Sequence, residues 1–286
     1  MRRILRRAAH FTTVALVIAC GPAEAQTRTI AVDGVPMRAW VSGITERKQG
    51  QPGLILESGA GAGLDEWRPV LTDLAALAPV VAYDRRGIGE SGPDAVKPTV
   101  ARVNQSLRAL LKELEVAPPY VLVGHSWGGA LIRGFAEASP SEIAGYVFIE
   151  VPDLDGTPEE VAAMLPPADR PAVLTPVTLP PIPPDTPPGL RAEMEVVGES
   201  LTNHWADVRR FHQLRGVPAA VVIAAPPARL RSPGDVQMRL QIKHQSEWAL
   251  LSSKGLIIVS GNTGHNVMRD DPALVIQAVK HVLRAQ

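Results

Sequence analysis

The stretch that most constrains the fold of this chain is 120–129, which reads YVLVGHSWGG. Its apolar residues at 120–123 predict a buried strand, and residues 130–138 predict a helix directly after it. Between the two stands a Gly-x-Ser-x-Gly pattern, in which Gly124 and Gly128 flank Ser126. A side chain at either glycine would clash where strand and helix cross, so the pattern predicts a sharp strand–turn–helix unit with Ser126 at its tip.

Apolar runs and helix-like segments alternate on both sides of this unit. Strands are expected at 28–33, 36–42, 53–56, 80–83, 145–149, 219–225 and 256–259, and Asp33-Gly34 joins the first two as a hairpin. Helices are expected at 65–76, 99–115, 235–251 and 272–285, the first with Asp65 as its N-cap. Strands that are almost wholly apolar and alternate with helices predict an α/β fold, with a mostly parallel central sheet covered by helices on both faces.

The alternating pattern breaks from 152 to 217. Residues 166–188 are dense in proline, which excludes regular helix and favours extended backbone, and helices are expected on either side of them, at 158–164 and 190–214. An insertion of this length between strands is typical of an active-site lid. The alternative is a disordered linker, but the segment contains apolar side chains to bury, namely Met194, Trp205, Phe211 and Leu214. We therefore expect a core made of 26–151 and 218–286, with a lid or cap at 152–217.

The N-terminus has the features of an export signal. Its arginines at positions 2, 3, 6 and 7 precede an apolar run at 11–19 and the cleavage-site pattern Ala23-Glu24-Ala25. The run is shorter than the roughly 20 residues that a membrane span needs. We expect residues 1–25 to be a signal peptide and the protein to be periplasmic or extracellular. Val17-Ile-Ala-Cys20 also resembles a lipobox, so a lipid anchor at Cys20, the only cysteine, is the alternative.

Charge gives no indication of a polymeric partner. The 29 Lys and Arg residues balance the 29 Asp and Glu residues, and no long run of either sign occurs, so nothing points to nucleic acid. His204, His212 and His244 lack paired metal-ligand spacing and are expected in the lid or on the surface. No Gly-Lys-Ser/Thr follows the glycines at 59–63, which argues against a phosphate-binding loop. A small-molecule partner is expected, and the oligomeric state stays open.

Three motifs together resemble the α/β-hydrolase superfamily over essentially the whole chain from residue 27. They are Gly124-His-Ser-Trp-Gly-Gly129, Asp84-Arg-Arg-Gly-Ile-Gly-Glu-Ser91 and Gly264-His265 before the last helix. The resemblance implies that Ser126 is a nucleophile on a nucleophile elbow and that His265 is its base. A serine hydroxyl needs such a base, and the imidazole pKa lies near working pH. His125 is expected to point away from the site.

The acid of the triad departs from the usual pattern. Most superfamily members carry it after the strand that here is 219–225, but no acidic residue follows that strand before Asp235. Glu150 instead follows the strand at 145–149, as in some haloalkane dehalogenases and some lipases, and the order Ser126, Glu150, His265 fits the superfamily. We expect Glu150 to orient His265, with Asp235 and Asp153 as the alternatives.

Acyl transfer also needs hydrogen-bond donors for the developing oxyanion. The resemblance implies the backbone N–H groups of Trp127 and Ala60. The charges at 84–91 are expected to fix the turn beside the elbow. Trp127 and Trp67 are candidates for an acyl pocket, with core packing as the alternative for Trp67.

The expected function is that of a secreted serine hydrolase that cleaves a carboxylic ester or similar acyl bond through an acyl-enzyme on Ser126. No metal or organic cofactor is implied. A serine at this position argues against dehalogenase and epoxide hydrolase chemistry, for which the family uses Asp. The alternatives are an acyltransferase or perhydrolase with the same triad, and a non-catalytic binding protein of the same fold.

Overall fold

The computed structural model describes residues 25–175, 178–209, 216–230 and 234–286. Residues 1–24 of the predicted signal peptide (1–25), with Cys20, lie outside these ranges, as do Phe211, His212 and Leu214 of the insertion. The described residues form an eight-stranded sheet in the order β1-β2-β4-β3-β5-β6-β7-β8. The predicted α/β fold with a mostly parallel sheet is therefore confirmed.

Only one edge of the sheet is antiparallel. The hairpin of β1 (Gln26–Val32) and β2 (Val35–Ser42) turns at Asp33 and Gly34, both at positive φ, and β2 also pairs antiparallel with β4. The remaining pairings are parallel and join β4 (Val80–Tyr83), β3 (Gly53–Glu57), β5 (Tyr120–His125), β6 (Ile143–Ile149), β7 (Ala219–Ala224) and β8 (Gly255–Ser260). The strands from β3 to β7 are buried apart from the half-buried Ala144, as near-continuous apolar runs predict.

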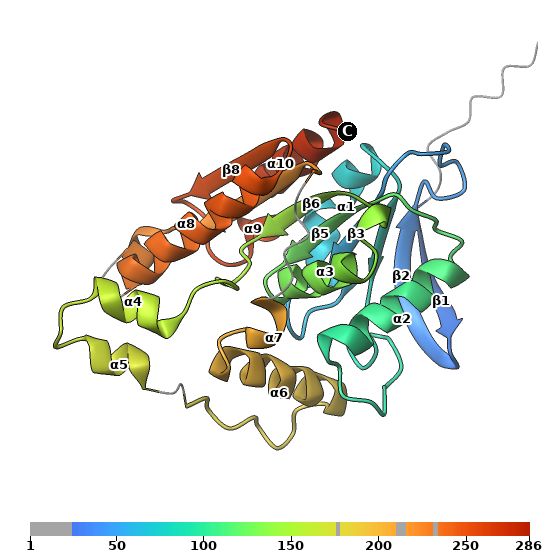
Figure 1. Ribbon diagram of the computed structural model, residues 1–286. Helices are drawn as coiled ribbons and strands as arrows, with labels where there is room; N and C mark the ends of the chain where they lie inside the picture. The colour runs from blue at the N-terminus through green and yellow to red at the C-terminus, as the bar shows by residue number, and fades with distance from the viewer. Residues whose placement is uncertain (1–24, 176–177, 210–215, 231–233) are drawn as a thin grey trace, which may run out of the picture.

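Helices cover both faces of the sheet (Figure 1). One face packs against α2 (Val100–Glu113), α3 (Trp127–Ala138) and α8 (Gly234–Leu251). The other packs against α1 (Arg68–Ala75), α9 (Val267–Asp270) and α10 (Pro272–Arg284). In the part of the chain that the structure describes, no helix is long and apolar enough to span a bilayer.

Asp65 is not the N-cap of α1, contrary to the prediction. It lies inside a single 3₁₀ turn, Leu64–Trp67, and α1 begins at Arg68 with a proline in its first turn. The Asp65 carboxylate instead accepts hydrogen bonds from Arg38 and Arg68. The N-cap of α2 is Thr99, whose side chain accepts from the Arg102 N–H.

The described part of the insertion contains four helices, α4 (Pro158–Met164), α5 (Arg170–Leu174), α6 (Pro188–Thr202) and α7 (Ala206–Arg209). In Figure 1 α4 and α5 lie together by one end of α8, whereas α6 and α7 form a separate pair on the side of α3. Two predictions were wrong here. The proline-dense part does contain a short helix, α5, because Pro171 falls in its first turn, where a missing N–H costs nothing. The helix expected at 190–214 ends at Thr202, because His204 and Trp205 adopt positive φ and break it.

Candidate active site

Ser126 lies between β5 and α3 in a strained backbone conformation, with φ 51° and ψ −122°. These angles belong to the first central residue of a type II′ turn, a position that usually holds glycine. The turn is tight, since a Cβ on Gly124 would lie 2.7 Å from the Gly128 oxygen and one on Gly128 would lie 2.2 Å from the Glu57 oxygen. The predicted elbow geometry is therefore present, and it places Ser126 at the carboxyl end of the sheet.

Glu150 follows the neighbouring strand β6 and also adopts positive φ, 47°. Its Oε2 lies 3.2 Å from Nδ1 of His265, and its Oε1 accepts the N–H of Ala224 at 2.7 Å. The carboxylate is almost wholly buried, with 1% of the side chain exposed, whereas His265 is 52% exposed. Glu150 thus fixes one edge of the imidazole ring to the end of β7, and much of the ring stays accessible.

Ser126, Glu150 and His265 line one cavity of about 420 Å³. Ala60 and Trp127, the two predicted oxyanion donors, line it as well. The rest of its wall comes from the residue after Glu150, from the insertion and from α8, namely Val151, Pro152, Val197, Leu201, Trp205, Gln237, Met238 and Gln241. Trp67 is fully buried elsewhere and donates its indole N–H to Ser58 at 2.9 Å, so core packing accounts for it.

His125 does not point away from the site, contrary to the prediction. Its Nε2 lies 2.8 Å from the backbone oxygen of His265, and the two rings stand 4.8 Å apart between centroids. Its Nδ1 lies 2.9 Å from Glu66, which also accepts the Gly59 N–H at 2.9 Å. Burial acts to raise the pKa of Glu66, but His125, the Gly59 N–H and Arg85 outweigh it and lower that pKa. His125 and Glu66 thus connect the His265 loop to the loop of Gly59.

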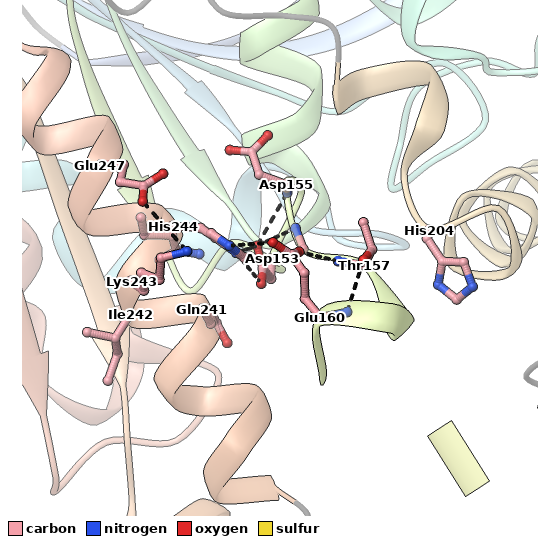
Figure 2. Close-up of polar contacts among 12 residues, drawn as sticks. Asp153, Asp155, Thr157, Glu160, His204, Gln241, Ile242, Lys243, His244 and Glu247 are labelled. Carbon is pink, nitrogen blue, oxygen red and sulfur yellow. Dashed lines mark hydrogen bonds and ion pairs between the residues drawn. The ribbon is translucent and has the colours of Figure 1, made fainter. Parts of the chain in front are cut away.

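The two alternative acids have other partners. Asp153 contacts the buried ring of His244, with 2.8 Å between Oδ2 and Nδ1, and Asp235 pairs with Arg239 at 3.2 Å. His244 is buried on α8, so it lies neither in the lid nor on the surface, contrary to the prediction. Its ring lies between Asp153 and α4, with Glu160 3.8 Å from Nε2 (Figure 2).

The contacts around Asp153 and His244 belong to a polar cluster that holds the start of the insertion against α8. The amides of Gln241 and Gln245 donate to the Val151 oxygen at 2.9 and 2.7 Å, and the Trp248 indole N–H donates to Asp155. His204 lies apart from it in Figure 2. Within the described ranges, no three His, Cys, Asp or Glu side chains are arranged to hold a metal ion.

The loop after β3 carries Ala60 between two anchored neighbours. The Gly59 N–H donates to Glu66 and the Gly61 N–H donates to Glu193 at 2.8 Å. Trp127, the other predicted donor, is the first residue of α3, where backbone N–H groups have no partner within the helix.

The charged loop at 84–91 holds its own turn and also reaches beyond it. Asp84 accepts the N–H groups of Leu64 and Glu90 at 2.7 and 2.9 Å, which fixes the turn as expected. Arg85, by contrast, reaches into the loop of Ala60 and binds Glu193. Sequence reasoning missed the pair, because an arginine beside an aspartate in a turn and a glutamate inside a helix carry no signal of their own.

Comparison with known proteins is consistent with this architecture. A family model described as the alpha/beta hydrolase fold matches residues 52–178. The uncharacterized protein YqjL of Bacillus subtilis is 30% identical over 125 residues, 43% of this chain and 47% of that protein. A haloalkane dehalogenase of Mycolicibacterium smegmatis is 37% identical over 108 residues, 34% of each chain. The chain thus spans about half or less of the length of these relatives.

A solved structure extends the likeness to nearly the whole chain. The epoxide hydrolase CorEH matches 91% of this chain and 99% of its own, with a TM-score of 0.61 at 15% identity. The sheet order and the residues gathered at the carboxyl ends of β5 and β6 are those of a hydrolase-fold protein. Residues 52–178 thus match the alpha/beta hydrolase family model, and the chain as a whole has the α/β-hydrolase fold.

Proposed function

We propose that the protein is a serine hydrolase that cleaves a carboxylic ester or a similar acyl bond through an acyl-enzyme on Ser126. The observation that carries the proposal is one cavity lined by Ser126, on its strained turn, and by His265, whose Nδ1 is held by the buried Glu150. The haloalkane dehalogenase and the epoxide hydrolase among its relatives show that the superfamily hosts several chemistries. A serine at the elbow favours acyl transfer among them.

The chemistry follows from these roles. Nε2 of His265 takes the Ser126 proton while Oγ attacks the carbonyl carbon, and the carbonyl electron pair moves to its oxygen. The tetrahedral intermediate collapses and expels the alcohol, which leaves with the proton of the imidazolium. Water then attacks the acyl-enzyme by the same steps and releases the acid. Glu150 stabilises the imidazolium, and the N–H groups of Trp127 and Ala60 stabilise the oxyanion.

The cavity favours a neutral substrate with an apolar portion. Its volume of about 420 Å³ suits a small molecule. Apart from Glu150 and His265, its described lining contains no charged side chain, and much of it is apolar, as at Leu201, Trp205 and Met238. The amides of Gln237 and Gln241 add polar groups that can orient the substrate.

Labelling with a fluorophosphonate tests the proposal directly, together with turnover of p-nitrophenyl esters of graded acyl length. The parent should be labelled at Ser126 and should hydrolyse at least one ester, and Ser126→Ala should do neither. A non-catalytic binding protein would show no labelling and no turnover. Added alcohol or hydrogen peroxide identifies an acyltransferase or perhydrolase by a new ester or peracid product. Parent-like turnover by Ser126→Ala would refute the proposal.

A further inference from the structure

Arg85 is a buried arginine whose three side-chain nitrogens all donate. Nη1 donates to Glu57 at 2.7 Å and to the Ser58 oxygen at 2.9 Å. Nη2 donates to the Gly59 oxygen at 2.7 Å, and Nε donates to Glu193 at 2.6 Å. The guanidinium also stands 5.1 Å from the ring of Trp127. Arg85 therefore touches the loop of Ala60, the elbow and the insertion at once.

The contact with the Gly59 oxygen sets the direction of the Ala60 N–H. Both groups belong to one planar peptide, and in a trans peptide they point in opposite directions. Because Arg85 holds the oxygen on its own side, the Ala60 N–H must point away from Arg85. Ala60 lines the cavity, so this peptide orientation decides whether its N–H can serve a developing oxyanion there.

Glu193 of α6 holds the other side of the same loop. Its Oε2 accepts the Gly61 N–H at 2.8 Å, and the two carboxylate oxygens bind Arg85 at 2.6 and 3.0 Å as a fork. The side chain is fully buried although it belongs to the insertion. One carboxylate thus fixes the peptide after Ala60 directly and the peptide before it through Arg85.

Helix α6 is seated closely on this part of the core. A Cβ on Gly189, in its first turn, would lie 2.1 Å from the Gly87 oxygen, so the two backbones are in direct contact. Arg85 also pairs with Glu57, to which Tyr83 donates its hydroxyl proton, and burial raises the pKa of Glu57. If α6 moved away, Gly61 and Arg85 would lose Glu193 together. The hold on both peptides beside Ala60 therefore depends on the position of α6.

We propose that Glu193 is a positioning residue that couples the docking of α6 to the orientation of the Ala60 N–H, so that the oxyanion site is complete only with the insertion docked. The inference rests on the proposed function, because it concerns the oxyanion site of that reaction. It adds a residue of the insertion, outside the cavity lining, to the groups on which turnover depends.

Glu193→Gln tests the coupling, since an amide keeps the shape but turns a donor toward Arg85 or Gly61. We expect kcat to fall about 10- to 100-fold, less than or equal to the loss of an oxyanion donor, with KM within about threefold. The inhibition constant of a trifluoromethyl ketone, which forms a tetrahedral adduct on the serine, should rise by a similar factor. Labelling of Ser126 by the fluorophosphonate should slow but still reach completion.

Glu199→Gln is the matched control, because Glu199 lies on the same helix and pairs with Lys97 at 2.7 Å on the surface. It should leave kcat and the ketone affinity unchanged. If Glu193→Gln lowers the melting temperature but not kcat or ketone affinity, the coupling is refuted. Should that variant fold poorly, Glu193→Asp, which keeps the charge and shortens the reach, is measured against the same criteria. An unlabelled parent would instead refute the proposed function itself.

Discussion

The Glu150 carboxylate is the side chain on which the triad assignment depends most. It is buried, and its two oxygens contact different elements, the end of β7 and the His265 ring. Glu150→Gln keeps the shape but removes the charge that stabilises the imidazolium, and it favours the wrong tautomer. For the equivalent acid of serine proteases this costs roughly 10,000-fold in kcat, and we expect a loss of that order in ester turnover.

Asp235→Asn is the control, since Asp235 pairs with Arg239 in the first turn of α8. It should leave turnover unchanged and alter stability by about 1 kcal/mol or less. The reverse ranking of the two variants would assign the role of the acid to Asp235.

Single residues could be predicted where a motif or a strand end marked them. Ser126, Glu150 and His265 each follow a predicted strand, and the carboxyl ends of parallel strands meet at one edge of the sheet. The structure brings all three to one cavity, and their catalytic roles remain predictions. Glu66, Arg85 and Glu193 could not be predicted, because each acts through contacts that only the folded chain creates.

Among the elements, the His265 loop depends on the contact between His125 and Glu66. The lowered pKa of Glu66 means that its carboxylate contributes stability above its ordinary pKa of about 4.3, and that this contribution is lost as the pH falls through the lower folded-state value. Glu66→Gln should therefore lower the melting temperature by a few degrees at pH 7. The difference from the parent should shrink below about pH 4. A difference that is constant from pH 3 to 8 would contradict this assignment.

Helix α6 supplies Val197 and Leu201 to the cavity, so its side chains should set the length of the acyl or alcohol group. Leu201→Trp adds bulk at a partly exposed position, and we expect preference to shift by at least two carbons toward shorter p-nitrophenyl esters, with little change in melting temperature. Met194→Trp is the control, because Met194 is similarly exposed on the same helix but does not line the cavity. Equal profiles for the two variants would show that α6 does not set specificity.

Element types were predictable because strand and helix periodicity persist over many residues. The errors fell where one backbone angle or one cap decides the outcome. The positive φ at His204 and Trp205 ends a helical pattern that the side chains would continue, and a proline in the first turn starts α5 where proline density argued against helix.

At the scale of the whole molecule, the predicted parallel sheet says nothing of strand order. That order places β4 on the outer side of β3, and this brings Arg85, just after β4, beside the loop that follows β3. The seating of the insertion could not be predicted either, because Glu193 reaches Gly61 across 132 residues of sequence. Both are long-range properties that local patterns do not encode.

At Ser126, stability and catalysis favour different residues. A non-glycine residue at such angles costs about 1–3 kcal/mol, whereas glycine adopts them freely and costs about 0.4–1 kcal/mol through the unfolded chain. Ser126→Gly should therefore raise the free energy of unfolding by about 1 kcal/mol and abolish turnover. A library screened for heat resistance alone should return this substitution among its survivors, and a screen that also demands ester cleavage should remove it.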